Sequence, residues 1–154
     1  MTTELLKIYF TYDPETGLFC RKADGKIYNK TNNKGYISIK FDGKEYQASR
    51  LAWLYMTGEN PDCFIDHINR NPADNRFSNL RKASYAENNR NRSMARNNTS
   101  GYKGVNWHKH RNKWRAEIKV NNKAITLGYF ENAIDAHYAY IQASEKYHKQ
   151  FGCI

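Results

Sequence analysis

The residues best suited to catalysis lie between Ile65 and Asn91, where an Asp-His pair ends a short apolar run. A loop rich in Asn and Arg follows Asp66 and His67, and Asn88 lies further along. Carboxylate and amide oxygens bind hard cations, histidine accepts protons near neutral pH, and arginine binds phosphate. Together these residue types predict metal-assisted hydrolysis of a phosphodiester, which is the chemistry of a nuclease.

These side chains must be brought together by the elements on either side of the loop. The apolar run is predicted to be a strand that ends at Asp66 and His67, and residues 80–82 pair back onto it. Residues 84–87 have the sequence S-Y-A-E, the form of a capping box, so a helix is expected to start there and to carry Asn88 in its first turns. The order strand, loop, strand, helix allows the three side chains to converge on one metal ion.

The segment before this stretch is predicted to contain a small antiparallel sheet. Residues 18–21 and residues 44–48 are short strands, and residues 35–41 alternate apolar and polar side chains as a strand does. The pair Asp42-Gly43 is a hairpin turn signal, whereas residues 23–34 are polar and are predicted to be a loop. The outer face of this sheet carries Lys and Tyr, for which DNA contact and plain solvation are both open.

Two further segments before the Asp-His pair have helical character. Residues 7–11 fit either a strand or a short helix. Ser49 is expected to cap a helix over residues 50–57, which Gly58 ends. The apolar residues of this second helix are expected to pack under the hairpin that follows.

From Gly101 onward the sequence predicts a three-stranded antiparallel sheet. Strands are expected over residues 102–108, residues 113–120 and residues 124–130, and Asn121-Asn122 is expected to form the hairpin turn between the last two. Residues 113–120 alternate strictly, so one face is apolar and the other carries Arg, Glu and Lys.

One long helix is expected to cover the apolar face of this sheet. It runs from Ala133 to about Lys149, capped by Asn132 with Asp135. His137 and His148 are interpreted as ordinary helix residues. The residues expected in the core of this part are Trp107, Trp114, Ala133, Ala136, Tyr140, Ala143 and Tyr147.

Composition and charge restrict the partner and the compartment. The formal charge of +10 and the pI near 9.5 favour a polyanionic partner over a merely basic protein. No apolar stretch reaches the roughly 20 residues of a membrane span, and the N-terminus lacks the layout of a signal peptide, so a cytoplasmic protein is expected. Residues 92–100 are polar and basic, and they are predicted to link a domain at 1–91 to a domain at 101–154.

The cysteines do not point to a disulfide framework or a zinc site. Cys20, Cys63 and Cys153 are odd in number, and no two of them have close spacing. Buried free thiols are the simpler interpretation.

Two parts of the chain resemble known families. Residues 35–91 resemble the HNH homing endonucleases of phages and introns, through G-Y-I-S-I, R-L-A-W-L, D-H-I-N-R-N, D-N-R-F-S-N-L-R and E-N-N-R-N in that order. Residues 100–152 resemble an AP2 DNA-binding domain, through S-G-Y-K-G-V-N-W, K-W-R-A-E-I, L-G-Y-F and D-A-H-Y-A-Y. The resemblance implies an α+β fold, with a small antiparallel sheet and a ββα-metal motif followed by the three-stranded sheet on one helix.

The first resemblance also implies roles for particular residues. Asp66 and Asn88 would be the protein ligands of one divalent ion, with Mg²⁺ expected and Mn²⁺ as a substitute. His67 would be the general base, and Asn79 would steady the loop and orient that histidine. Many relatives have His where this chain has Asn88 or Ser49, and the chemistry is expected to survive both differences.

Double-stranded DNA is the partner that both resemblances imply, in a phage-infected bacterial host. Arg76 and Arg81 suit either a phosphate clamp or ordinary ion pairs, and Asn75 is expected to build the loop through local hydrogen bonds. Candidate DNA contacts elsewhere are Arg92, Arg96, Lys103, Asn106, His108, Arg115, Lys119 and Thr126.

Two other functions compete with the endonuclease. The first is a non-catalytic, sequence-specific DNA-binding protein or transcriptional regulator that uses the AP2-like part. The second is a structural or RNA-binding protein. No obligate protein partner is evident from the sequence, one site per chain predicts a nick, and a double-strand cut would require a homodimer or two successive nicks.

Overall fold

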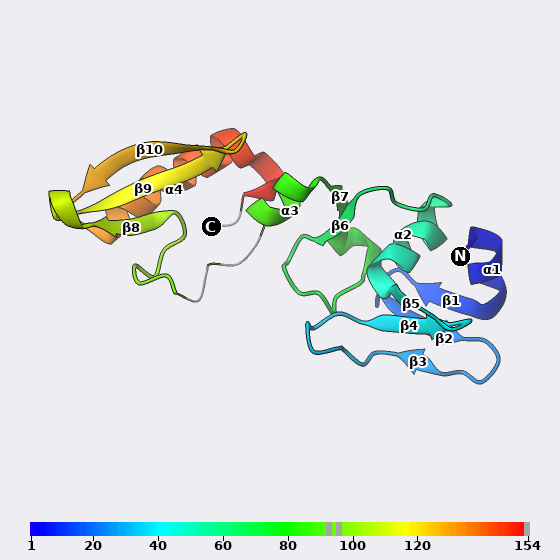
Figure 1. Cartoon of the computed structure of the whole chain (residues 1–154). Coiled ribbons are helices and arrows are strands. Elements are labelled where there is room, and N and C mark those ends of the chain that lie inside the picture. The colour runs from blue at the N-terminus through cyan, green and yellow to red at the C-terminus, as the bar shows by residue number, and fades with distance from the viewer. Residues whose placement is uncertain (92–93, 95–96, 153–154) are drawn as a thin grey trace. The chain divides into compact units, whose positions relative to one another are not determined.

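The computed structural model describes residues 1–91, 94 and 97–152. The chain divides into two compact units, Met1–Asn88 and Asn89–Ile154, and the division falls within helix α3 (Tyr85–Arg90). The architecture is the α+β arrangement expected from the sequence, with the ββα motif in the first unit and a sheet packed on one helix in the second (Figure 1). None of the helices in the described part of the chain is long and apolar enough to cross a membrane.

The first unit opens with a helix and a small sheet. Helix α1 (Thr3–Tyr9) leads into β1 (Phe10–Asp13), which pairs antiparallel with β2 (Leu18–Arg21). The ambiguous residues at the start of the chain are therefore mostly helical. β2 pairs in turn with β3 (Ile27–Tyr28), so the prediction of a loop throughout residues 23–34 was wrong. Two residues are too short a strand to give a recognisable alternation.

A hairpin and a second helix follow in the first unit. β4 (Ser38–Phe41) and β5 (Lys44–Gln47) pair through the predicted turn, with Asp42 and Gly43 both at positive φ. Helix α2 (Ala48–Thr57) ends at Gly58 as predicted. Its start was predicted wrongly, because Gln47 is the N-cap residue and Ser49 is buried inside the first turn.

The ββα motif follows α2. β6 (Phe64–His67) pairs antiparallel with β7 (Leu80–Ala83), and a short 3₁₀ helix, η1 (Phe77–Asn79), comes just before β7. In Figure 1 the two strands run side by side and lead into α3. The core of the first unit gathers apolar side chains from α1, α2 and the sheets, namely Leu6, Phe10, Tyr12, Phe19, Ile37, Ile39, Ala48, Leu51, Ala52, Leu54 and Leu80.

The second unit is a three-stranded antiparallel sheet with one long helix on its apolar face. The strands are β8 (Val105–His108), β9 (Lys113–Val120) and β10 (Lys123–Phe130), in the order β10-β9-β8. A 3₁₀ helix, η2 (Lys109–Arg111), joins the first two strands. Helix α4 (Ala133–His148) packs on the sheet and continues into η3 (Lys149–Phe151) (Figure 1).

Most of the predicted core of the second unit is confirmed, with exceptions at its ends. Ala136, Tyr140 and Ala143 are buried, but Trp107 is 43 % exposed and Tyr147 is 39 % exposed, so their placement in the core was wrong. Trp107 lies on the apolar face directly opposite Trp114, at the end of the sheet, where it gains only an edge contact to that ring. Helix α4 also buries two polar residues, Ser144 and His148.

Two smaller predictions also needed adjustment. Asn132 is the N-cap residue of α4, but its side chain bonds the carboxylate of Asp135 and makes no hydrogen bond to the helix backbone. Cys20 and Cys63 are free thiols, as expected, but they are only partly buried. Cys153 lies outside the described residues.

Gly104 is the tightest point between the sheet and α4. It adopts a positive φ of 75°, and a Cβ there would lie 2.0 Å from the ring of Tyr140. Gly104→Ala is therefore expected to destabilise the second unit by about 3 kcal/mol, from backbone strain and overpacking together. Chemical unfolding of a Trp53→Phe background, in which Trp107 and Trp114 provide the fluorescence, measures this change.

Gly101→Ala is the matched control for that substitution. Gly101 has the same φ of 75°, but a Cβ there meets nothing within 4 Å. Gly101→Ala is expected to lower the stability of the second unit through backbone strain alone, by about 1–2 kcal/mol. Equal losses for the two variants would show that contact with Tyr140 contributes nothing.

His148 makes the second unit sensitive to acid. Burial lowers its pKa, the positive charges of Arg90 and Lys103 lower it further, and the hydrogen bond from Nε2 to the carbonyl oxygen of Lys119 (3.0 Å) opposes them. Nδ1 is buried and has no partner in the described part of the chain. Because the unfolded chain binds a proton near pH 6.5 and the folded unit resists it, stability is expected to fall as the pH drops below that value. Urea unfolding at pH 7.5 and at pH 5 should show this loss in the wild type.

The control for the acid prediction is a pair of substitutions. His148→Gln keeps an N–H donor but does not titrate, so it is expected to reduce the difference in stability between the two pH values. His110→Gln changes an exposed histidine in η2 and is expected to leave that difference as it is. An unchanged pH dependence in His148→Gln would contradict the assignment.

Candidate active site

The register of the β6–β7 hairpin places the Asp-His pair at the end of a buried strand. Asp66 lies opposite Arg81, and His67 lies opposite Leu80. Asp66 and His67 are only 5 % and 6 % exposed. Burial of two adjacent polar residues requires that each finds hydrogen-bonding partners inside the fold.

Asp66 is held by its cross-strand neighbour. Its Oδ2 accepts hydrogen bonds from Nε and Nη2 of Arg81, both at 2.8 Å. Both side chains are largely buried, so this ion pair is strongly desolvated and breaking one half of it is costly. Arg81 makes this ion pair with Asp66, and its contact with a phosphate stays a prediction.

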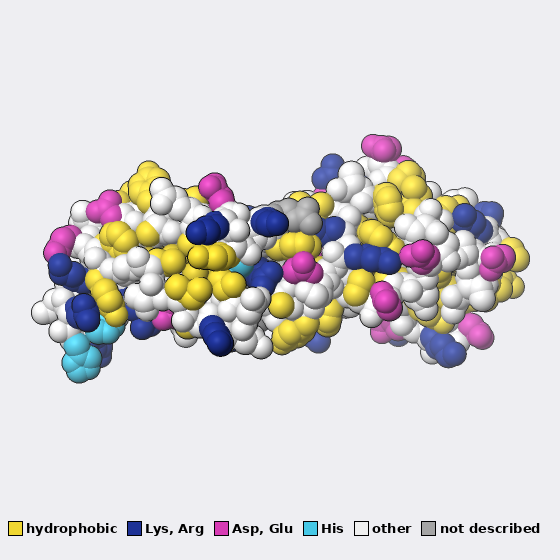
Figure 2. Space-filling view, turned by 90° about the horizontal axis from the view of Figure 1, so that it is seen from above, with side chains coloured by type: hydrophobic (Ala, Val, Ile, Leu, Met, Phe, Trp, Pro, Cys, Tyr) yellow, Lys and Arg dark blue, Asp and Glu magenta, His cyan; other side chains and the backbone are white. Residues whose placement is uncertain are grey.

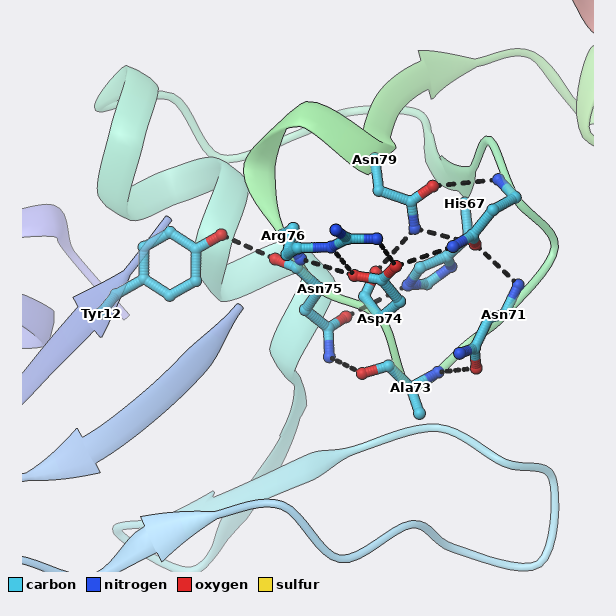
Figure 3. A network of polar contacts seen from close by, with 9 residues as sticks. Tyr12, His67, Asn71, Ala73, Asp74, Asn75, Arg76 and Asn79 are labelled. Atoms are coloured by element: carbon cyan, nitrogen blue, oxygen red, sulfur yellow. Dashed lines mark hydrogen bonds and ion pairs between the residues drawn. The ribbon is translucent and has the colours of Figure 1, made fainter. Parts of the chain in front are cut away.

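The loop between β6 and β7 is organised by Asn79. Its Oδ1 accepts from the backbone N–H of Asn69 (2.9 Å), while Nδ2 donates to Asn69 Oδ1 (3.0 Å) and to the carbonyl oxygen of Asp74 (2.8 Å). Figure 3 shows the Asn79 side chain close to Asp74 within this network. Asn79 thus links the beginning of the loop to its end, as a residue that steadies the loop would.

Asn75 is the residue that bonds to the histidine. Its Oδ1 lies 3.1 Å from Nε2 of His67, and its side chain is almost completely buried (Figure 3). From the sequence we expected only local hydrogen bonds for Asn75, so its contact with His67 was not predicted. Nothing in the sequence distinguishes it from the neighbouring Asn69 and Asn71, because the path of the loop decides which amide points inward.

Arg76 closes the outer side of the loop. Its guanidinium makes two hydrogen bonds to the carboxylate of Asp74, from Nε to Oδ1 (2.8 Å) and from Nη2 to Oδ2 (2.6 Å). This pairing lowers the pKa of Asp74 to about 2, so its carboxylate remains charged. Arg76 is half exposed and therefore borders the site from the solvent side.

The environment of His67 favours its neutral form. Burial lowers its pKa, and the hydrogen bond to Asn75 and the negative charges of Asp66 and Asp74 only partly offset that effect. A neutral imidazole is the form that can accept a proton from water. The centre of its ring also lies 6.1 Å from the centre of the Tyr36 ring, so Tyr36 borders the site.

The predicted capping box fixes the position of Asn88 in the chain by starting helix α3. Glu87 Oε2 accepts from the backbone N–H of Ser84 (2.8 Å) and from its hydroxyl (2.7 Å), and the N–H of Glu87 donates to Ser84 Oγ (3.3 Å). This confirms the helix start. The N–H of Asn88 donates to the carbonyl oxygen of Ser84 (2.9 Å), which sets Asn88 in the first turn of α3.

The available donors fit a hard divalent cation. A carboxylate from Asp66 and an amide oxygen from Asn88 are the ligand types that Mg²⁺ accepts, and Mg²⁺ commonly keeps several waters. Within the described ranges there is no group of three or more His, Cys, Asp or Glu side chains that could hold a metal. A soft-metal or zinc cage is therefore a poor match for this site, whereas an ion shared with water and phosphate fits.

The candidate DNA contacts of the second unit lie mainly on the sheet. Asn106 accepts from Nε of Arg115 (3.1 Å), and Arg115 also pairs with Glu117 (3.2 Å), so these side chains form a connected row on the outer face. His108 packs edge-on against Tyr129 on the same face. Lys119 and Thr126 are exposed on β9 and β10.

Three other candidate contacts, Lys103, Arg92 and Arg96, differ from that group. Lys103 precedes β8, and its Nζ donates to the carbonyl oxygen of Arg90 (2.7 Å). Arg92 and Arg96 lie outside the described residues. On the face seen in Figure 2, Lys and Arg side chains are spaced among acidic and uncharged ones, and histidines gather at the end of the second unit that carries η2.

Comparison with known proteins gives two family matches. Residues 46–90 match the HNH endonuclease model, and residues 100–150 match the AP2 domain model. The chain is 42 % identical to protein 3.8 of Escherichia phage T7 over 82 residues, which are 51 % of this chain and 68 % of that protein.

A solved structure described as DNA binding and cleavage by the HNH homing endonuclease I-HmuI is also similar. It is 25 % identical with a TM-score of 0.46, and the match covers 56 % of this chain. The chain spans about half, 54 %, of the length of that protein.

Proposed function

Because this chain belongs to the HNH endonuclease family and carries an AP2 domain, we propose that it hydrolyses a phosphodiester bond of double-stranded DNA with one divalent metal ion. The expected ion is Mg²⁺, with Mn²⁺ as a substitute. The observation that supports this proposal best is the pair at the end of β6. Asp66 is a buried carboxylate, and next to it His67 is a buried histidine that favours its neutral form.

Each residue of the site has a separate task in the proposed reaction. His67 accepts a proton from a water molecule as the water oxygen attacks phosphorus and the bond from phosphorus to the 3′ oxygen breaks. Asp66 and Asn88 would hold the ion, which when bound neutralises charge on the phosphate and on the leaving oxygen. Asn79 maintains the loop that carries these groups. The products are a 3′-hydroxyl and a 5′-phosphate.

The second unit would hold the DNA. Its sheet presents Asn106, Arg115, Lys119 and Thr126, and Asn and Arg pair with adenine and guanine edges respectively in the major groove. The domain arrangement that goes with this is a nuclease domain at 1–91, a linker at 92–100 and a DNA-binding domain at 101–154. One active site per chain cuts one strand, so the expected product is a nick.

The ends of the cut strand test the proposal. Supercoiled plasmid incubated with the protein and Mg²⁺ is expected to become open circular before any linear form appears. DNA ligase should reseal the nicks, because a 3′-hydroxyl next to a 5′-phosphate is its substrate. Nicks that ligase cannot seal without end repair would contradict breakage of the bond to the 3′ oxygen, and duplex RNA that is cut equally well would contradict the choice of DNA.

A further inference from the structure

The hydrogen bonds of Asn75 specify which nitrogen of His67 carries the hydrogen. Asn75 Nδ2 donates to the carbonyl oxygen of Ala73 (3.3 Å), which turns Oδ1 toward His67 Nε2 at 3.1 Å. An amide oxygen can only accept, so Nε2 must donate. In a neutral imidazole the lone pair then belongs to Nδ1, which is the nitrogen able to take a proton from water.

The backbone of Asn75 is held from the other end of the first unit. The hydroxyl of Tyr12, on β1, donates to the carbonyl oxygen of Asn75 at 2.7 Å (Figure 3). Tyr12 is 7 % exposed, and burial with the charges of Asp13 and Asp74 raises the pKa of its hydroxyl. The hydroxyl therefore keeps its hydrogen and remains a donor. This bond joins residues 63 positions apart in the sequence.

The turn between β1 and β2 supports the same segment at two more points. The carbonyl oxygen of Pro14 accepts from the N–H of Phe77 (3.0 Å). Gly17, at a φ of 75°, lies so close that a Cβ there would be 2.4 Å from the backbone of Asn75 and Arg76. Contacts on both sides of Asn75 fix its position more firmly than the loop alone would.

We propose that Tyr12 is a positioning residue of the nuclease site, which acts through Asn75 to hold His67 with its hydrogen on Nε2. The proposal rests on the proposed function for its effect on cleavage, but its effect on the imidazole does not depend on cleavage. Tyr12 and the turn that follows it lie outside the residues that match the HNH endonuclease model. The N-terminal sheet is thereby part of the catalytic unit in addition to supporting its fold.

Nitrogen-15 NMR of the histidine side chains tests the proposal directly. Spectra of the full-length, metal-free protein at pH 8, where the imidazole is neutral, distinguish the two tautomers of His67. The wild type is expected to show hydrogen on Nε2 only. Tyr12→Phe, which removes one hydroxyl, is expected to show a mixture, because Asn75 is no longer fixed.

The chain offers a matched control for the lost hydroxyl. Tyr55 packs against Tyr12 in the same aromatic cluster, and its own hydroxyl makes no hydrogen bond in the described part of the chain. Tyr55→Phe is expected to keep the wild-type tautomer. If Tyr55→Phe shifts the tautomer as much as Tyr12→Phe does, packing accounts for the effect and the proposal fails.

Substitutions of Asn75 keep the test informative should Tyr12→Phe fold poorly. Asn75→Leu has a similar size but no acceptor, and it should lose the preference for Nε2. Asn75→Asp restores an acceptor oxygen and should restore that preference. An unchanged tautomer in both Asn75→Leu and Tyr12→Phe would overturn the proposal.

Nicking kinetics then separate this proposal from the proposed function. Tyr12→Phe is expected to lower kcat by about 10-fold with little change in KM, as loss of a supporting hydrogen bond does. A rise of about 10-fold in KM with kcat unchanged would contradict a positioning role. A wild-type protein with hydrogen on Nε2 that never cuts DNA would overturn the proposed function, and the tautomer assignment would stand.

Discussion

Replacing His67 with Ala is expected to reduce the rate of DNA nicking by about 10²–10⁴-fold, which is the usual contribution of a general base. The side chain is buried at the end of β6 and favours its neutral form, so it is available to take the proton of the attacking water. DNA affinity should change by less than about 2-fold, because contacts on the sheet of the second unit are untouched. Rates at saturating protein and gel-shift affinities give the two values.

The control for His67→Ala is another histidine of the same chain. His110 is exposed in η2 and belongs neither to the ββα motif nor to the candidate DNA contacts. His110→Ala should nick at close to the wild-type rate. Nicking by His67→Ala at the wild-type rate would remove His67 from the mechanism.

Asp66→Ala is expected to have the second largest effect, and it should affect cleavage and stability together. Cleavage should fall at least about 10²-fold, because the carboxylate is one of the two protein ligands in the proposed site. Stability should fall by about 3–5 kcal/mol, because the substitution breaks the buried ion pair between Asp66 and Arg81. Plasmid nicking across a series of Mg²⁺ concentrations and chemical unfolding measure the two losses.

A double variant separates these two losses. Asp66→Ala combined with Arg81→Met removes both buried charges, so it should recover much of the lost stability. It should not recover cleavage, because the carboxylate is still missing. Recovery of cleavage in the double variant would show that Asp66 acts only as the partner of Arg81 and not as a metal ligand.

The elements around the site could be predicted because their signals are local. The S-Y-A-E capping box placed the start of α3, and the alternation in β9 gave its two faces. Asp42-Gly43 and Asn121-Asn122 specified hairpin turns through their tolerance of positive φ, which both pairs adopt. Each of these features depends on neighbours within a few residues.

The contacts that complete the site could not be predicted, because they join distant parts of the chain. The bond from Tyr12 to Asn75 spans 63 positions, and no local pattern marks either residue. The ion pair between Arg81 and Asp66 depends on the β6–β7 register, which places the two residues opposite each other. Trp107 follows the apolar alternation of its strand, yet it remains exposed because it lies at the end of the sheet.

The central claim is that Asp66, His67 and Asn88 form a metal-dependent site that cuts DNA. One plasmid experiment tests it most directly, with wild type and His67→Ala purified identically and assayed in Mg²⁺, then in excess EDTA, then with Mg²⁺ restored. The wild type should convert supercoiled plasmid to open circles, stop in EDTA and resume when Mg²⁺ returns, while His67→Ala should leave the plasmid supercoiled throughout. Nicking that continues in EDTA, or that is equal in the two proteins, would contradict the claim.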